Sequence, residues 1–318
     1  MELYFLGTGA GSPAKHRNVT SIVLNLLPER GSYWLFDCGE GTQHQILKSP
    51  IRLGKVDKIF ITHLHGDHLY GLPGVLTSRC YQGGEDPLVL YGPKGIGAFV
   101  RQVLDISGAQ LTYKLRVVEI EHEGNLYEDD RFSVEARRLN HRIESFGYRI
   151  VEKDLPGKLD HARLKALGVP AGPLFGRLKN GESITLENGQ VIHGPDYVGE
   201  PVKGRIITIL GDTQKTPNAV KLAQGADLLV HEATFGAERQ DLAGAYGHST
   251  TIDAARTAEE AGVGTLVLTH ISSRYGEDAS SLAKEARRIH AETFVAEDFW
   301  SISIPRKDKK GETPQENG

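Results

Sequence analysis

Short apolar runs alternate with amphipathic segments along most of this chain. Runs rich in β-branched and aromatic residues predict strands, and they lie at 2–6, 21–26, 33–37, 58–62, 87–91, 132–140, 205–211, 227–230, 265–269, 294–296 and 300–304. Apolar residues at helical spacing predict helices, which we expect from 42 onward and at 72–81, 97–106, 249–261 (with Ser249 as N-cap) and 282–292. This succession of strands and helices predicts an α/β fold.

One segment breaks the pattern. Residues 152–203 are rich in glycine, proline and charge, with basic side chains from Lys153 to Lys179. We expect a short helix at 160–167, a hinge-like centre at 168–176 and a hairpin at 184–192 that turns at Asn188-Gly189. Because apolar residues are few, we expect an arm without a core of its own, inserted into a domain that spans 1–305. The alternative is a surface insertion with no function.

Composition narrows the protein class. With 318 residues and 39% hydrophobic content, the chain can bury a large core. No apolar run approaches the roughly 18 residues that a membrane-spanning helix needs. The N-terminal residues are predicted to form the first strand. Two cysteines argue against a disulfide scaffold and fit a reducing cytoplasm. The net charge of −4 does not indicate a nucleic-acid binder, although a local basic patch can act within an acidic chain. The residues from 306 to 318 are expected to be disordered.

The strand predicted at 58–62 runs into a cluster of imidazoles. Three histidines and one carboxylate follow within six residues, as His63, His65, Asp67 and His68. In extended chain His63 and His65 point to the same side, whereas Asp67 and His68 lie beyond Gly66, where the chain can turn. This spacing suits two neighbouring ions, and the ligand types suit zinc or a similar metal. The alternative is a solvated turn in which Asp67 caps the next helix.

Four other predicted strands end next to a possible ligand: His141, Asp212, His231 or His270. A single histidine at a strand end is more often structural than metal-binding. In α/β proteins, however, sites are built where strands end at one edge of a sheet. Several such residues together with the cluster at 63–68 therefore indicate one shared site.

The arrangement of these residues resembles the motifs of a known protein family. The pattern His63-x-His65-x-Asp67-His68, with His141, Asp212 and His270 downstream, resembles the metallo-β-lactamase hydrolase superfamily. Within it, the chain resembles the short-form tRNA 3′-processing endoribonucleases, the RNase Z family. The features that carry this closer resemblance are the loop Pro13-x-Lys15-x-Arg17-Asn18, the motifs His231-Glu232-Ala233-Thr234 and His248-Ser249-Thr250, and the glycine- and proline-rich segment.

The resemblance implies a four-layer αββα sandwich with an inserted, protruding tRNA-binding arm, and a site for two zinc ions. One ion would be held by His63, His65 and His141, and the other by Asp67, His68 and His270, with Asp212 between them. Manganese or another divalent transition metal would accept the same ligands.

The resemblance also implies a function. Precursor tRNA would be cut at its 3′ side, which leaves a 3′-hydroxyl on the tRNA and a 5′-phosphate on the trailer. Asp67 would orient or deprotonate the attacking water, and His248 would donate a proton with Glu232 orienting it. Substrate would contact Lys15, Arg17 and Asn18, and Gly172 and Pro173 in the arm. The family is typically homodimeric, and we expect a cytoplasmic protein.

The same residues allow other interpretations. His248 could merely begin a helix, and Lys15 and Arg17 could belong to an ordinary solvated loop. A dizinc phosphodiesterase or arylsulfatase acting on small molecules would use the same ligands. The remaining alternative is a non-catalytic module that binds RNA or protein and in which the metal ions are structural. Structural zinc sites are normally closed by four protein ligands. Seven candidate ligands for two ions leave room for solvent, which favours catalysis.

Overall fold

The computed structural model describes residues 1–276 and 279–306. Of the tail expected to be disordered, only Arg306 therefore lies within the described residues. The chain divides into two compact units. The larger unit comprises Met1–Val151 and Ile206–Ile304, and the smaller comprises Glu152–Arg205 with Pro305 and Arg306. Along the described residues, no helix has the length and apolar character needed to cross a membrane.

Two seven-stranded sheets form the larger unit. The first has the order β16 (Ser301–Ser303), β1 (Glu2–Gly7), β2 (Ser21–Leu26), β3 (Ser32–Phe36), β4 (Val56–Phe60), β5 (Leu88–Gly92) and β6 (Leu115–Glu119). The second has the order β15 (Thr293–Val295), β14 (Thr265–Thr269), β13 (Leu228–Glu232), β12 (Ile206–Leu210), β9 (Phe146–Glu152), β8 (Phe132–Arg138) and β7 (Gly124–Glu128). Strands β3 to β6 are parallel, as are β12 to β15.

Aromatic side chains fill the space between the sheets. The Phe60 ring stacks on Phe36 and on Tyr91, with ring centroids 4.9 Å apart in both pairs. From the second sheet, Tyr148 approaches Phe60 at 5.3 Å. All four residues belong to one buried cluster that includes residues of both sheets. Burial of such large apolar faces is the main force that holds the two sheets together.

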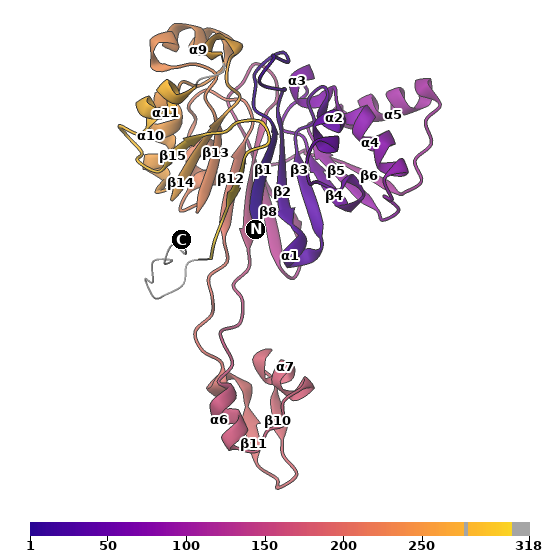
Figure 1. Cartoon of the computed structure of the whole chain (residues 1–318), viewed down its shortest axis with the longest axis vertical. Coiled ribbons are helices and arrows are strands. Elements are labelled where there is room, and N and C mark those ends of the chain that lie inside the picture. The colour runs from indigo at the N-terminus through magenta and orange to yellow at the C-terminus, as the bar shows by residue number, and fades with distance from the viewer. Residues whose placement is uncertain (277–278, 307–318) are drawn as a thin grey trace. The chain divides into compact units, whose positions relative to one another are not determined.

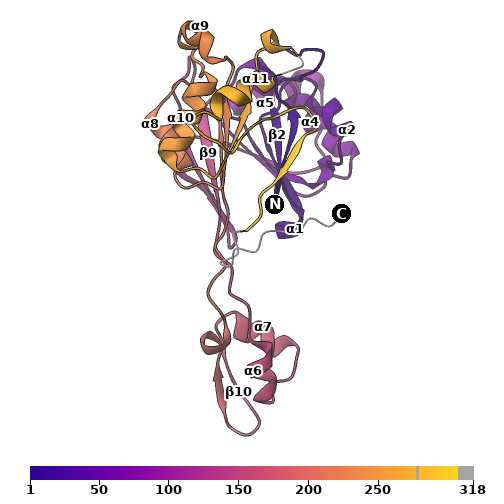
Figure 2. The ribbon, with the colours of Figure 1, turned by 60° about the vertical axis from the view of Figure 1, so that its left-hand side comes forward.

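Helices cover the outer face of each sheet (Figures 1 and 2). On the first sheet these are α2 (Thr42–Leu47), α4 (Leu72–Tyr81) and α5 (Ile96–Ser107), whose apolar residues share a buried cluster with β3, β4 and β5. On the second sheet they are α8 (Pro217–Ala223), α10 (Thr251–Ala261) and α11 (Ser280–Ala286). The remaining helices of this unit are short: α1 (Leu27–Arg30), α3 (Gly66–Leu69), α9 (Gln240–Tyr246), η1 (Leu53–Lys55), η3 (Ala237–Arg239) and η4 (Ser273–Tyr275). The αββα sandwich expected from the sequence is confirmed.

Some boundaries differ from the predictions. Helix α10 is capped by Thr250, which forms a capping box with Asp253, and the Ser249 hydroxyl instead donates to the Thr213 carbonyl. The helix expected at 282–292 ends at Ala286. Strands β6, β7 and β9 and helices α8 and α9 were not predicted. Strands β6 and β7 lie at sheet edges, where exposed positions carry polar side chains and the apolar pattern weakens.

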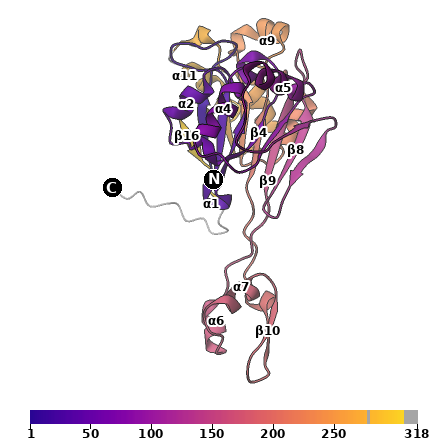
Figure 3. The same cartoon turned by 90° about the vertical axis from the view of Figure 1, so that its right-hand side faces the viewer.

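The smaller unit has its own core, so the expectation of too few apolar residues was wrong. It contains α6 (His161–Ala166), α7 (Pro173–Lys179), η2 (Gly194–Tyr197) and the hairpin β10 (Ser183–Thr185) with β11 (Val191–His193) (Figure 3). The side chains buried together are Leu164, Val169, Leu178, Ile184 and Ile192. The turn at Asn188-Gly189 is confirmed, with Gly189 at φ +83°. The expected hinge instead contains the start of α7.

Removal of the Phe60 ring tests the packing between the sheets. We expect Phe60→Ala to lower the free energy of unfolding by about 3–5 kcal/mol, because it leaves a cavity among four other aromatic rings, Trp34 included. Tyr81→Ala is the matched control, since this side chain is 91% exposed and its loss should change stability by no more than about 0.5 kcal/mol. Denaturant unfolding followed by circular dichroism measures both. Equal effects of the two substitutions would contradict the assignment of Phe60 to the core.

Candidate metal centre

The histidine cluster lies where β4 leads into a short helix. Strand β4 ends at Phe60, and α3 begins at Gly66 with His65 as its N-cap. His63 and His65 therefore precede the helix, whereas Asp67 and His68 lie within it. Asp67 is not the helix cap, which removes the alternative of a simple capped turn. In the first turn, its negative charge also faces the positive end of the helix dipole.

The other predicted ligands come from the second sheet. His141 follows β8, Asp212 follows β12, and His270 follows β14 in a left-handed conformation at φ +56°. His231, in contrast, lies inside β13, is buried, and belongs to none of the ligand groups found among the described residues. The expectation that possible ligands at strand ends share one site therefore holds for three of these four residues.

Two groups of possible ligands form. The first contains His63, His65, His141 and Asp212, and the second contains Asp67, His68 and His270. Within each group, one ligand atom from every residue lies within 4.8 Å of the others. A third, overlapping group combines Asp212 and His270 with His248. The structure thus brings together all seven residues that the resemblance marked as ligands.

Ring nitrogens face one another at short range. His65 Nδ1 lies 3.1 Å from His63 Nε2 and 3.2 Å from His141 Nε2. In the second group, His68 Nε2 lies 3.2 Å from His270 Nε2. Two bare lone pairs repel at such distances, so each pair of nitrogens needs a shared proton or a shared metal cation between them. Nitrogen and carboxylate donors are the set that zinc and related metals accept. The residues present therefore fit bound divalent metal.

Asp212 faces both groups. Its Oδ1 lies 3.4 Å from His68 Nε2, and its Oδ2 lies 3.6 Å from His63 Nε2 and 3.4 Å from His270 Nε2. Burial would raise the pKa of Asp212, but the surrounding histidines His270, His68 and His63 hold it well below its usual value. An ionised carboxylate whose Oδ2 faces a histidine from each group is placed to bridge two cations.

The outer nitrogens of four rings have hydrogen-bond partners. His68 Nδ1 lies 2.8 Å from Asp37 Oδ2, and His141 Nδ1 lies 2.7 Å from the Gly247 carbonyl oxygen. Two threonine hydroxyls occupy the same place beside His63 and His270. Such outer contacts orient metal-binding imidazoles. The sequence analysis did not select these partners. Asp37 directly follows β3, so its position at the end of a strand could have identified it, as it identified Asp212.

The pKa values differ among the rings. Burial, aided by the neighbouring His68, lowers the pKa of His63 well below its usual value. Burial also lowers the pKa of His141. For His68, burial acts in the same direction, but Asp212 and Asp37 outweigh it and raise the pKa well above its usual value. Neutral rings are ready to bind metal, and a charged His68 must lose its proton when metal binds.

Glu232 and His248 form a pair next to the two groups. Glu232 Oε1 lies 3.0 Å from His248 Nδ1 and also accepts from the Ser249 backbone N–H at 2.9 Å. Burial alone would lower the pKa of His248, but the hydrogen bond to Glu232 and its charge raise that pKa to about 9. His248 therefore carries a proton at neutral pH, which suits a proton donor.

Asp67 is held by the loop after β1. The Gly11 backbone N–H donates to Asp67 Oδ2 at 2.7 Å, and His270 Nε2 lies 3.2 Å from the same oxygen. Burial would raise the pKa of Asp67, but the contacts with His270 and His68 lower it below its usual range. The carboxylate stays ionised and available as a base or ligand.

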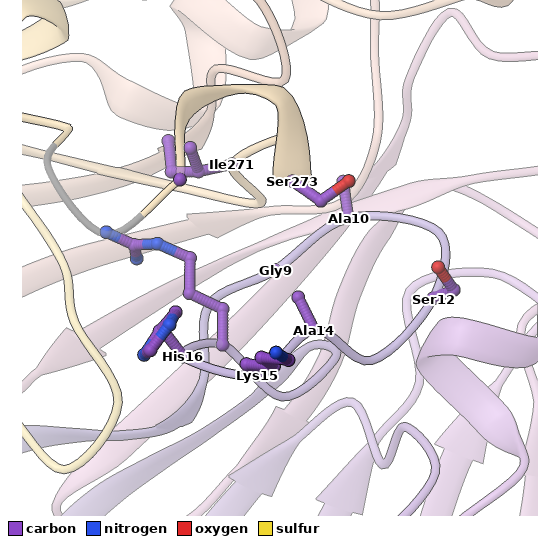
Figure 4. A pocket seen from close by; sticks show the side chains of 10 residues that line it. Gly9, Ala10, Ser12, Ala14, Lys15, His16, Ile271 and Ser273 are labelled. Atoms are coloured by element: carbon purple, nitrogen blue, oxygen red, sulfur yellow. The ribbon is translucent and has the colours of Figure 1, made fainter.

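The loop at 9–17 lines a pocket beside the site (Figure 4). Lys15 is exposed on this loop, as expected for a substrate contact. Arg17 is not: it is 4% exposed, and its guanidinium donates to Thr8 Oγ1 and the Ala296 carbonyl. The Asn18 side chain donates to the Glu40 carbonyl. These contacts give Arg17 an anchoring role in the loop, and its contact with substrate stays a prediction.

The remaining substrate candidates lie elsewhere. Gly172 and Pro173 are exposed at the start of α7 in the smaller unit, with Gly172 at φ +142°. Sequence reasoning did not select Arg142 and Tyr246, which line the pocket that contains His65, Asp67 and His270. The Arg142 guanidinium lies 5.1 Å from the Tyr246 ring centre. A guanidinium at this place suits an anionic phosphodiester.

Comparisons with known proteins agree with this geometry. A family model described as anti-Pycsar protein Apyc1 matches residues 1–146. Ribonuclease Z of Geobacillus kaustophilus is 57% identical to this chain, over 96% of the chain and all of that protein. Ribonuclease Z of Bacillus licheniformis is 56% identical, with the same coverage.

Among solved structures, the short form of human tRNase Z is 35% identical and has a TM-score of 0.71, over 96% of this chain and all of the human one. A metallo-β-lactamase fold protein from Bacillus subtilis, at 18% identity and a TM-score of 0.65, shares the fold. The identity to named relatives over nearly the full chain, together with the two ligand groups, shows that this chain belongs to the ribonuclease Z family of endoribonucleases.

Proposed function

We propose that this chain removes the 3′ trailer from precursor tRNA in a metal-dependent hydrolysis. The observation that carries the proposal is the pair of ligand groups with Asp212 facing histidines of both, and with His248 held by Glu232 beside them. The solved human relative is named as a tRNase Z, which supports tRNA as the substrate. Cleavage would leave a 3′-hydroxyl on the tRNA and a 5′-phosphate on the trailer.

Two divalent metal ions, which we propose to be zinc with manganese as the alternative, would occupy the two groups. His63, His65 and His141 would hold one ion, Asp67, His68 and His270 the other, and Asp212 would contact both. When bound, two such ions would lower the pKa of a water molecule and stabilise the charge that develops on the phosphate.

The chain's own residues then handle the protons and the substrate. Asp67, fixed by the Gly11 N–H, orients the attacking water and accepts its proton. The water oxygen bonds to phosphorus while the bond from phosphorus to the 3′-oxygen breaks. His248 gives its proton to that leaving oxygen. Glu232 keeps His248 charged until the transfer, because the carboxylate stabilises the imidazolium.

Substrate binding is proposed for two regions. Near the site, Lys15 and Arg142 are placed to contact phosphates of the RNA. In the smaller unit, we propose that Gly172 and Pro173 help to bind the body of the tRNA, with 152–203 acting as an arm inserted into a hydrolase domain of residues 1–305. RNA helices display little sequence to side chains, so recognition of shape is expected.

We also propose that the protein is a cytoplasmic homodimer. The composition supports this location, since two free cysteines fit a reducing compartment. Exposed apolar side chains on helices of the first sheet, Leu47 and Ile106, are candidates for an interface. Apolar residues that stay exposed in one chain often mark a contact with another.

Metal content tests the shared site. We expect about two divalent ions per chain after loading and dialysis, and loss of both in Asp212→Ala, because both groups lose the carboxylate that faces their histidines. His122→Ala is the matched control, since this exposed histidine lies outside the groups. Atomic emission on zinc-loaded and manganese-loaded protein gives the ion count. An Asp212→Ala variant with two tightly bound ions would contradict the bridge.

Replacement of His248 tests the proton donor. We expect His248→Ala to lower kcat by about 10²–10⁴-fold with metal content unchanged. Loss of a metal ion instead would show that His248 is a ligand, as the third group allows. Because the pKa of His248 is about 9, the donor is protonated below that pH, and turnover should fall as pH rises through it. Glu232→Gln should move that fall toward the ordinary histidine value of 6.5, which a pH profile of kcat measures.

A variant without the arm tests the substrate class. Leu155 and Val202 exchange backbone hydrogen bonds of 2.9 Å, so an Asn-Gly turn can replace 156–201. We expect kcat/KM for precursor tRNA to fall more than about tenfold, because phosphate contacts are lost. Hydrolysis of bis(4-nitrophenyl) phosphate should persist. Equal retention of both activities would favour a small-molecule phosphodiesterase, and inactivity of the intact, metal-loaded protein would favour a binding module.

A further inference from the structure

Two buried threonines occupy equivalent positions beside the two ligand groups. Thr62 Oγ1 lies 2.9 Å from Asp37 Oδ2 and 3.0 Å from His63 Nδ1. Thr234 Oγ1 lies 2.9 Å from Glu232 Oε2 and 2.8 Å from His270 Nδ1. Both side chains are shielded from solvent, at 0% and 4% exposure. Each hydroxyl thus links a carboxylate to the outer nitrogen of one ring.

A hydroxyl has a single proton, so it can donate in only one direction. An ionised carboxylate accepts only. The Glu232 carboxylate also accepts from the Thr234 and Ser249 backbone N–H groups, and Asp37 accepts from the Thr62 backbone N–H at 2.7 Å. With acceptors of this kind on one side, each threonine donates to the carboxylate and presents a lone pair to the ring. The ring nitrogen Nδ1 must then carry the proton.

The direction of this hydrogen bond determines which nitrogen can bind metal. A neutral imidazole carries one proton, so a proton on Nδ1 leaves Nε2 with a free lone pair. His63 Nε2 and His270 Nε2 are the atoms that face Asp212, at 3.6 and 3.4 Å. A reversed hydroxyl would donate to Nδ1 and place the ring proton on Nε2, where it would block coordination.

We propose that Thr62 and Thr234 are positioning residues that fix His63 and His270 in the tautomer with an unprotonated Nε2, one threonine for each metal group. The inference rests on the proposed metal-dependent function. The other two outer acceptors, the Gly247 carbonyl for His141 and Asp37 for His68, contact their rings without an intermediate. For the two threonines, in contrast, a neighbouring carboxylate must set the direction in which the hydroxyl donates its proton.

The arrangement gives each outer carboxylate a second role. Glu232 holds His248 through Oε1 and, through Oε2 and Thr234, controls His270. Asp37 contacts His68 directly and controls His63 through Thr62. One carboxylate therefore connects the proton donor to a metal ligand, and the other connects one ligand from each group.

The test compares valine with serine at both positions. Valine keeps the approximate shape of threonine without the hydroxyl, whereas serine keeps the hydroxyl. We expect Thr62→Val and Thr234→Val each to weaken one of the two zinc-binding steps by about 10–100-fold and to spare the other. Thr62→Ser and Thr234→Ser should stay within a few-fold of the parent chain. Competition with a chromophoric zinc chelator measures both steps.

A second readout concerns the rings themselves. Nitrogen chemical shifts of the imidazoles in the metal-free protein distinguish the two tautomers. The parent chain and the serine variants should show His63 with its proton on Nδ1, and Thr62→Val should show a mixture of tautomers. A purely structural role would lower the melting temperature without changing this signal. If one valine variant fails to fold, the variant at the other threonine still provides the comparison.

The outcomes separate this inference from the function on which it rests. If the parent chain binds two zinc ions and both valine variants bind them equally well, the threonine proposal is overturned and the metal site remains. If serine fails as valine does, side-chain shape rather than the hydroxyl matters, and the proposal is also overturned. If the parent chain binds no zinc, the proposed function itself fails.

Discussion

The crowding of imidazole nitrogens around one buried carboxylate is the constraint on which the rest of the site depends. Ring nitrogens of five histidines gather beside Asp212, and neighbouring nitrogens lie 3.1–3.2 Å apart. Bare lone pairs repel at these distances, so each pair needs a proton or a metal cation between its nitrogens. Outer contacts orient the rings, since Asp37 contacts His68 directly and Glu232 reaches His270 through Thr234.

The sandwich supplies the rigidity that this crowding requires. The ligands come from both sheets, so a shift of one sheet against the other would separate them. The stack of Phe36, Phe60 and Tyr91, with Tyr148 from the second sheet, opposes such a shift because aromatic cores are close-packed. Strand β4 carries Phe60 and leads directly to His63. The same strand therefore contributes to the core and to the metal centre.

Hydrolysis is proposed for residues of the larger unit, and binding of the tRNA body for residues of the smaller unit. The larger unit contains every proposed metal ligand and the proton donor. The smaller unit has a core of five buried aliphatic side chains, which allows it to keep its own shape. Hydrolysis of a phosphodiester needs only the first set of residues. Selection of a folded RNA requires contacts over a wider surface, which residues outside the metal centre would provide.

The sequence by itself determined the α/β class and most strand positions, because local apolar patterns specify strands. The sandwich and the full set of seven proposed ligands followed from motifs that resemble a known family, since His141, Asp212 and His270 lie far from His63 in the sequence. The sequence did not reveal the burial of Arg17, the roles of Asp37, Thr62 and Thr234, or the core of the smaller unit. A buried arginine and an exposed one look alike in a sequence, and the direction of a hydroxyl depends on a carboxylate from a distant segment. Only the tertiary structure decided these features, because each depends on which segments the fold brings together.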